Sequence, residues 1–222
     1  MCGNKMKDSS KAQWDEIYRK EQVSPAVQNG ITTIIDFFNR KKIKKILDLG
    51  CGSGGYIVYL AELGFDMYGL DFSEEGIKAA ATRIQEKNLH VNLTLSSIYE
   101  KLPYKDKFFD AIISIRTLHH GTIENIRALI KEIERILKPN GLIYLTVRKL
   151  IAEKRRLAFQ EIAPRTYIPL EGKEKGVIHY LFNKTILKKE FSRFKILELG
   201  ITYGPQDWEA YYHMLGELIS YQ

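Results

Sequence analysis

The chain has 222 residues, of which 45% are hydrophobic and 11% aromatic, enough to bury the core of one globular domain. Its apolar runs are far shorter than the roughly 20 residues that a membrane-spanning helix needs. The N-terminal segment is polar, without the apolar core of a signal peptide, so we expect a cytoplasmic protein with no membrane partner. The net charge of +7 favours anionic partners without choosing among them. Only Cys2 and Cys51 are present, which excludes a disulfide framework.

Between residues 44 and 147, short β-branched runs alternate with helical patterns, as is typical of β-α-β units around a parallel sheet. The pattern predicts strands over residues 44–49, 65–71, 91–95, 108–115 and 142–147. Helices are expected over 53–63, after Ser73 as N-cap, and after Thr122 as N-cap. Pro139 and the Asn-Gly pair after it predict a turn at the end of the last helix.

The pattern changes after residue 147. Residues 148–176 carry many charges, prolines and glycines, and only a partial helical pattern from Leu150 to Phe159. Basic and aromatic residues alternate there and would suit an anionic or aromatic ligand. Regularity returns with a helix near 183–191 and a strand at 194–204, whereas residues 208–220 are ambiguous between strand and helix.

A glycine loop follows the first predicted strand. Gly50, Gly52 and Gly55 have the spacing of a dinucleotide-binding loop, and Asp71, 21 residues after Gly50, satisfies the rule for a nicotinamide cofactor. Asp48 argues against that cofactor, because a carboxylate at this strand tip would repel a pyrophosphate. The pattern favours a cationic adenosine cofactor such as S-adenosylmethionine and leaves a nicotinamide oxidoreductase as an alternative.

Four segments resemble motifs of the class I S-adenosylmethionine-dependent methyltransferases, in the order of that family. They are "ILDLGCGSGG" (46–55), "GLDFSEEGI" (69–77), "LPYKDKFFDAIISIRTLHH" (102–120) and "IERILKPNGLIYLTV" (133–147). The chain is identified as a member of the family on these residues. The resemblance implies an α/β fold of Rossmann-like type: a seven-stranded, mainly parallel sheet with helices on both faces and an antiparallel last strand at 210–218.

The resemblance also implies which residues hold the methionine end of the cofactor. Asp48 would face the ammonium group, directly or through water. The backbone of Gly50, Cys51 and Gly52 would pass under the methionyl and ribose parts. For Cys51, a small packing residue is the expected role rather than a nucleophile, because no basic residue is beside it in sequence.

At the adenosine end, the resemblance implies that Asp71 accepts both ribose hydroxyls and that Phe72 lies against the adenine. Many relatives place an aspartate near the adenine amino group, followed by an apolar residue. Here Ser97 and Ile98 stand at those positions, so the apolar wall is expected and the amino contact is in doubt.

Catalytic candidates are His119, His120, Tyr18 and His179, one of which would act as a general base if the acceptor is a hydroxyl or a protonated amine. Because His119 and His120 are adjacent, their side chains are expected to diverge on a regular backbone, and no metal site is predicted. Trp14 lies four residues before Tyr18, on the same face of a segment that resembles the part folded over the cofactor in relatives.

We therefore expect a single domain over residues 1–222. Its parts are an N-terminal helical cap (1–29), a cofactor-binding core (30–147), an acceptor lid (148–182) and the C-terminal part of the sheet (183–222). The expected acceptor is a small molecule. A tRNA base is the alternative, because of the charge and because "HYLF" (179–182) is similar to wobble-uridine methyltransferases. A non-catalytic cofactor-binding protein is a further alternative, and the oligomeric state is not predicted.

Overall fold

The computed structural model describes residues 2–20, 30–149, 158–203 and 210–220. Its helices are α1 (Cys2–Lys20), α2 (Gly30–Arg40), α3 (Gly55–Glu62), α4 (Glu74–Glu86), α5 (Ile123–Ile136) and α6 (Lys184–Glu190). The strands of the main sheet are β1 (Lys45–Leu49), β2 (Asp66–Asp71), β3 (Val91–Leu95), β4 (Phe109–Ile115), β5 (Leu137–Arg148), β9 (Phe194–Tyr203) and β10 (Ala210–Leu218). A second sheet holds β6 (Phe159–Ala163), β7 (Thr166–Pro169) and β8 (His179–Tyr180). None of the helices in these ranges has the length and apolar character needed to cross a membrane.

The main sheet has the order β3-β2-β1-β4-β5-β10-β9. Strands β1 to β5 pair in parallel, whereas β10 is antiparallel to both of its neighbours, β5 and β9. This confirms the expected seven-stranded sheet with an antiparallel last strand. The ambiguous C-terminal segment is a strand because it is buried between two others, where every backbone N–H and C=O needs a partner.

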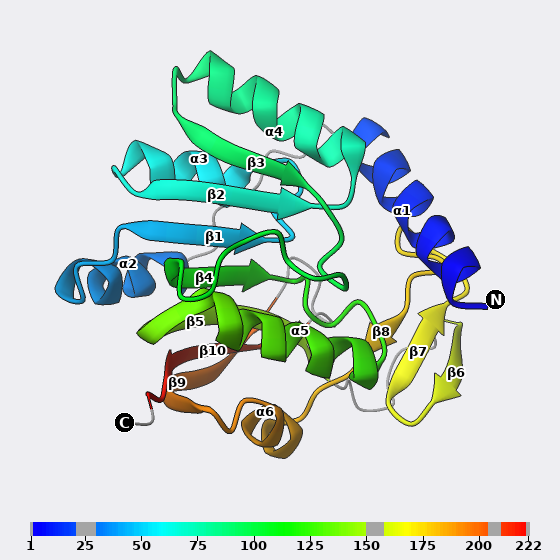
Figure 1. The fold of residues 1–222 in the computed structure, drawn as a ribbon. Helices are drawn as coiled ribbons and strands as arrows, with labels where there is room; N and C mark the ends of the chain where they lie inside the picture. Colours follow the sequence, from blue (N-terminus) through cyan, green and yellow to red (C-terminus); the bar gives the residue numbers. More distant parts are fainter. Residues whose placement is uncertain (1, 21–29, 150–157, 204–209, 221–222) are drawn as a thin grey trace.

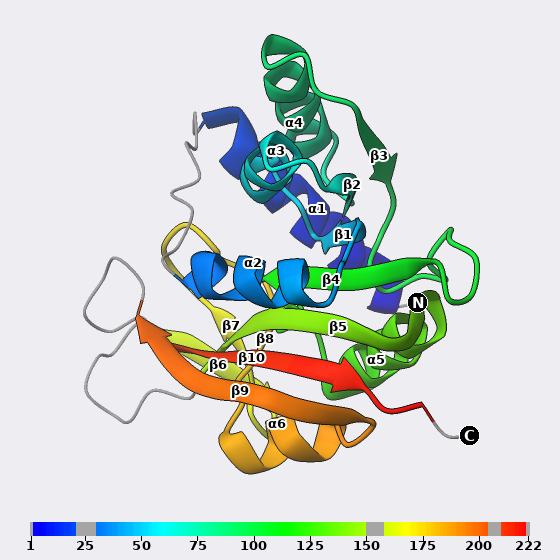
Figure 2. The same ribbon diagram turned by 90° about the vertical axis from the view of Figure 1, so that its left-hand side faces the viewer.

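Helices cover both faces of the sheet, and neighbouring strand residues point to opposite layers. In β1, Ile46 packs in the layer that holds α2, α3 and α4, whereas Leu47 packs in the layer that holds α5 and α6. Figure 2 shows α3 and α5 on opposite sides of the strands. Both layers are apolar, which explains why the parallel strands read as continuous hydrophobic runs in the sequence.

The predicted helix starts agree with the caps in the structure. Ser73 accepts a hydrogen bond from the backbone of Gly76 at 3.0 Å, and Thr122 forms a capping box with Asn125. The predicted turn at Pro139 lies inside the bounds of β5, which begins at Leu137. The pairing with β4 is interrupted between Leu137 and Leu142, and Asn140 has a φ of 63°. The chain leaves α5 at Leu137 and changes direction over these residues, because β5 runs parallel to β4 and α5 connects the two strands.

The helix α1 and the small sheet β6-β7-β8 lie at the carboxyl ends of the parallel strands (Figure 1). The small sheet lies within residues 148–182, the segment that the sequence predicts to be a lid. In the partial helical pattern of 150–159, residues 150–157 lie outside the described residues and Phe159 begins β6. Residues 21–29 of the expected N-terminal cap also lie outside them. Backbone hydrogen bonds of 2.8 Å from Tyr180 to His119 and of 3.0 Å from Phe182 to Arg148 attach β8 and the residues after it to the ends of β4 and β5.

Candidate active site

The glycine loop runs from the end of β1 into α3. Gly50, Gly52 and Gly54 have φ angles of 82°, 51° and 82°, a left-handed conformation that side chains with a Cβ rarely adopt. A Cβ on Gly52 would overlap the hydroxyl end of Tyr18, and a Cβ on Gly50 would overlap the side chain of Thr117. The glycines are therefore needed both for the turn and for the close approach of other elements.

Asp48 lies near the end of β1, two residues before Gly50 of the glycine loop. Its side chain is 2% exposed, and its Oδ2 has no hydrogen-bond partner among the residues that the structure describes. Burial, and next the negative charge of Asp71, raise the pKa of Asp48 to about 8. A positively charged ligand beside this carboxyl would offset both effects.

Asp71 ends β2 and connects two backbone segments. Its Oδ2 accepts a hydrogen bond from the Gly52 N–H at 2.8 Å, and its Oδ1 accepts one from the Ser73 N–H at 2.9 Å. Burial raises the pKa of Asp71 to about 6, although these backbone hydrogen bonds act in the opposite direction. Asp71 thus holds the glycine loop to the start of α4, a role that the spacing rule for ribose recognition did not include.

The other cofactor candidates lie along the same edge. Phe72 is partly buried next to Asp71, and Ile98 is partly buried against the core. The hydroxyl of Ser97 accepts a hydrogen bond from the Tyr99 N–H at 3.2 Å, so it serves a local turn. Cys51 is 8% exposed and packs in the apolar layer, where burial, followed by the charges of Asp71 and Asp48, raises the pKa of its thiol well above the ordinary value.

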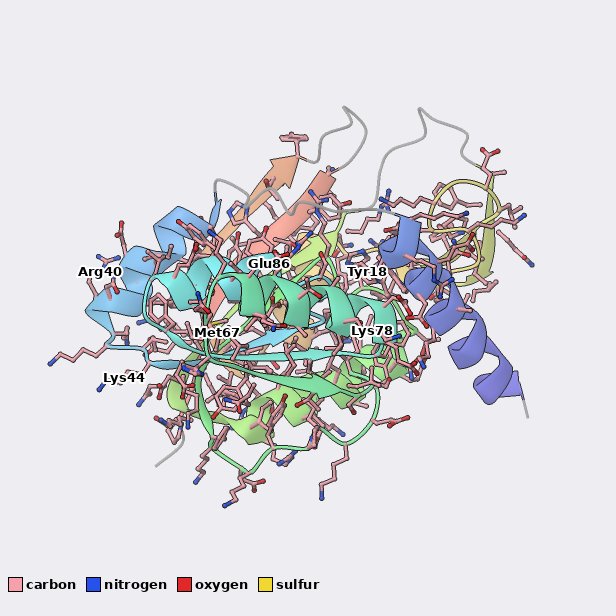
Figure 3. All side chains as sticks on the ribbon, turned by 90° about the horizontal axis from the view of Figure 1, so that it is seen from above. Tyr18, Arg40, Lys44, Met67, Lys78 and Glu86 are labelled. Atoms are coloured by element: carbon pink, nitrogen blue, oxygen red, sulfur yellow. The ribbon has the colours of Figure 1, made fainter. Side chains whose placement is uncertain are left out.

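The helix α1 is held against the start of α4. Asp15 accepts a hydrogen bond of 2.5 Å from the Ser73 hydroxyl and one of 3.3 Å from the Glu75 N–H, and Lys11 forms an ion pair of 2.6 Å with Glu74. Figure 3 shows Tyr18 at the same end of the molecule as the start of α4, with the Arg40 end of α2 on the far side.

These contacts bring Tyr18 onto the glycine loop. Burial, followed by the negative charges of Asp71, Cys51 and Asp48, raises the pKa of Tyr18 well above its ordinary value, so its hydroxyl stays protonated. Trp14 lies on the same side of α1 as Tyr18: its ring centroid lies 5.7 Å from that of Tyr18 and 5.2 Å from that of His120.

Three histidines lie close together next to Trp14. His119 and His120 follow β4, and His179 belongs to β8. The ring centroids lie 4.2 Å apart for His119 and His120, 4.8 Å for His120 and His179, and 5.7 Å for His119 and His179. The expectation that the two adjacent rings diverge is wrong, because residues 118–120 form a turn rather than a regular strand.

Two of these imidazoles have ring nitrogens without partners. His119 Nδ1 and His120 Nε2 are buried and form no hydrogen bond with any residue that the structure describes. Burial is the first cause that lowers the pKa of both rings, for His120 to about 3, and the neighbouring His179 adds to it. Both rings are therefore neutral at pH 7, and each keeps one nitrogen with a free lone pair.

His179 is held differently. Its Nδ1 lies 3.0 Å from the carbonyl oxygen of Val177, and its Nε2 lies 3.0 Å from Oε2 of Glu174. Arg148 donates a hydrogen bond to the same Oε2 at 3.1 Å. Burial raises the pKa of Glu174, but the hydrogen bond with His179 and the nearby positive charges outweigh it and hold the pKa below the usual range. Sequence reasoning missed Glu174, because a glutamate in a charged turn carries no signal.

The polypeptide segment at the centre of this site matches a known family. Residues 47–145 match the family model described as "Methyltransferase domain". These residues are similar to a methyltransferase domain, and they are called the methyltransferase domain below. The methyltransferase domain contains all eight cofactor candidates together with His119 and His120, whereas Tyr18 and His179 come from the segments before and after it.

Two curated relatives are each similar to about half of this chain. A ubiquinone biosynthesis O-methyltransferase of Rickettsia akari is 32% identical over 117 residues, which are 52% of this chain and 45% of the relative. A tRNA (carboxymethyluridine(34)-5-O)-methyltransferase of Arabidopsis thaliana is 39% identical over 103 residues, 46% of this chain and 23% of the relative. The matches thus cover less than half of either relative's own length.

Solved structures extend the similarity of fold beyond the methyltransferase domain. An S-adenosylmethionine-dependent methyltransferase of Methanosarcina mazei aligns with 85% of this chain and 98% of its own, with a TM-score of 0.73 and 22% identity. The segments outside residues 47–145 therefore belong to the same architecture, which supports the expected Rossmann-like methyltransferase fold.

Proposed function

We propose that this protein transfers the methyl group of S-adenosylmethionine to a small-molecule acceptor. The observation that carries the proposal is Asp48, a buried carboxyl with an unpartnered oxygen at the tip of β1. An anionic pyrophosphate would be repelled there, whereas the ammonium group of S-adenosylmethionine would satisfy the carboxylate. The chemistry that this cofactor supplies is a methyl group on a positively charged sulfur, which is a good leaving group.

The remaining cofactor residues follow from their places along the sheet edge. We assign the backbone of Gly50, Cys51 and Gly52 to the methionyl and ribose parts. Asp71 keeps lone pairs for the ribose hydroxyls beyond its two backbone hydrogen bonds. Phe72, Ser97 and Ile98 are assigned to the adenine, with Ser97 limited by its use in a turn.

The chain's own contribution to the reaction is position and proton transfer. A site covered by α1 and β8 would hold the acceptor in line with the methyl group. Such positioning lowers the activation barrier by roughly 7 to 11 kcal/mol. For a hydroxyl acceptor, the proton would pass to an imidazole. His119 and His120 each have a ring nitrogen without a partner among the described residues. This places them better for a general base than Tyr18, whose pKa is raised, or His179, whose nitrogens are both engaged, although their lowered pKa makes them weak bases.

A small-molecule acceptor is supported by the relative named for ubiquinone biosynthesis, which itself methylates oxygen according to its name. A cytoplasmic location for the reaction stays a prediction of the sequence. The acceptor's identity is tested by incubating the protein with radiolabelled S-adenosylmethionine and sets of phenols, carboxylates and amines. Label transfer to one of these classes supports the proposal.

A tRNA base is the second candidate acceptor, because the Arabidopsis relative is named for tRNA and is 39% identical over its match. The net charge of +7 agrees with an anionic partner. Salt dependence distinguishes the two acceptors. The affinity for tRNA would fall steeply as the salt concentration rises, because protein binding releases cations from the phosphates. Absence of tRNA binding at low salt would remove this candidate.

The cofactor is tested directly by calorimetry on the full chain. S-adenosylhomocysteine should bind with one molecule per chain, and reduced nicotinamide dinucleotides should not bind. Binding of the nicotinamide cofactor instead would overturn the proposal. Binding of S-adenosylmethionine without turnover on any acceptor, including tRNA, would indicate a non-catalytic cofactor-binding protein.

A further inference from the structure

We propose that His119, His120 and His179 form a binding site for a divalent transition-metal ion of the Zn²⁺ type. One ring nitrogen from each of the three lies within 4.8 Å of the other two. Imidazole nitrogens are preferred ligands of zinc and of its neighbours in the first transition row. Three protein ligands leave a position open for an acceptor, as in catalytic zinc sites.

Two ring nitrogens of this cluster are buried without a hydrogen-bond partner among the described residues. His119 is 1% exposed, and its Nδ1 has no partner among the described residues; the same holds for Nε2 of His120. A buried nitrogen without a hydrogen bond is costly, and an ion bound among the three rings would give a partner to such a nitrogen.

The distances between the ring nitrogens, up to 4.8 Å, are longer than in an occupied zinc site, so the rings would move toward the ion. Nitrogens bound to one zinc ion at 2.0–2.1 Å lie about 3.4 Å apart, so the nitrogens would approach by up to roughly 1.5 Å. His120 is only partly buried, and its ring can rotate into position. The backbone hydrogen bond of 2.8 Å between Tyr180 and His119 already holds β8 to the turn that carries the other two rings.

His179 also has the second partner that metal-binding histidines usually have. Its Nδ1 lies 3.0 Å from the Val177 carbonyl oxygen, which orients the ring, and an ion would take the place of the contact that Nε2 makes with Glu174. Glu174, 3.0 Å from that Nε2, adds negative charge and a possible carboxylate ligand. The guanidinium of Arg148 is paired with Glu174 at 3.1 Å, which reduces its repulsion of a cation.

Metal binding goes beyond the proposed methyl transfer, because the three ligands do not include any cofactor residue. In the enzyme, the open position would take an acidic oxygen of the acceptor, such as that of a phenol or a carboxylic acid. With their lone pairs on the ion, His119 and His120 would no longer act as the general base considered above. Coordination would lower the pKa of the acceptor oxygen, so its proton would leave to solvent. The oxyanion would then take the methyl group as the carbon–sulfur bond breaks and S-adenosylhomocysteine leaves.

The test uses the tag-free full chain, treated with a chelator and then titrated with Co²⁺ and with Zn²⁺ in the absence of cofactor. We expect one ion per chain, with visible absorption from Co²⁺ bound to nitrogen. His120→Gln should weaken binding at least about 10-fold, and Glu174→Gln about 10- to 100-fold. His90→Gln is the matched control, since His90 is exposed and lies outside the cluster, and its affinity should stay unchanged.

Thermal melts establish that each variant is folded. The inference is overturned if the wild type binds neither ion, or if the double variant His120→Gln/His179→Gln binds as tightly as the wild type. The same samples are titrated with S-adenosylhomocysteine. Cofactor binding without metal binding removes the metal site alone, and metal binding without cofactor binding removes only the proposed methyl transfer.

Discussion

Asp71 at the end of β2 accepts a hydrogen bond of 2.8 Å from the Gly52 N–H, which joins the second strand to the loop that follows the first. Asp71→Ala should therefore weaken S-adenosylhomocysteine binding by about 1.5 to 3 kcal/mol, the range for a hydrogen bond to a charged group. Calorimetry measures this loss. Asp106→Ala, an exposed carboxylate paired with Arg135 far from the loop, is the control. Equal affinities for the Asp71 variant and the wild type would contradict the ribose assignment.

Gly52 is constrained by both its backbone angle and its contact with Tyr18. Gly52→Ala should lower the free energy of unfolding by about 1 to 2 kcal/mol for the left-handed conformation, and further because the new Cβ meets the Tyr18 ring. Gly172→Ala is a matched control, since Gly172 has a φ of 80° and nothing within 4 Å of an added Cβ. Denaturant unfolding compares the two. If both variants lose the same stability, the contact with α1 is absent in solution.

Asp48 makes the stability of the cofactor-free protein depend on pH. Its pKa is raised from 3.8 to about 8, so between these values the folded state binds more protons than the unfolded state. The free energy of unfolding should therefore fall as pH rises from about 4 to about 8. Asp71, with a pKa raised to about 6, adds to the fall in the lower part of this range.

Urea denaturation between pH 5 and pH 8.5 measures this dependence, and Asp48→Asn should flatten it. Asp66→Asn, at the exposed start of β2, should leave the slope as it is. Cofactor affinity should change in the opposite direction, because a bound ammonium group favours the ionised carboxyl and binding then releases a proton. A pH-independent affinity through pH 8 would argue against contact between Asp48 and the ammonium.

Asp15 attaches α1 to the start of α4 through the Ser73 hydroxyl and the Glu75 N–H. Asp15→Ala should free the N-terminal helix locally, at a cost of about 0.5 to 2 kcal/mol, as for the loss of a helix cap. Hydrogen exchange in α1 should become faster and cofactor affinity lower, while the exchange of β4 is unchanged. Asp36→Ala, on the exposed face of α2, is the control. Unaltered exchange in α1 would show that other contacts hold the helix.

Much of the fold could be predicted because its signals are local. Ser73 and Thr122 cap helices through hydrogen bonds to residues three positions away, and apolar periodicity marked the buried faces. The segment at Pro139 shows the limit of such signals: the proline and the Asn-Gly pair predicted the turn, but not that β5 already begins at Leu137, which pairs with Phe109. Local preference gives way where tertiary hydrogen bonds compete with it.

By itself, the sequence determined which residues gather around the glycine loop, because Asp48, the glycines and Asp71 lie at strand ends that parallel pairing brings to one edge. Only the tertiary structure decided the histidine half. His179 and Glu174 are more than 50 residues from His120 in sequence, and no periodicity links them. They meet because β8 bonds to the turn after β4, and the same turn aligns the two adjacent imidazoles. Contacts of this kind depend on long-range backbone pairing, which residue spacing does not encode.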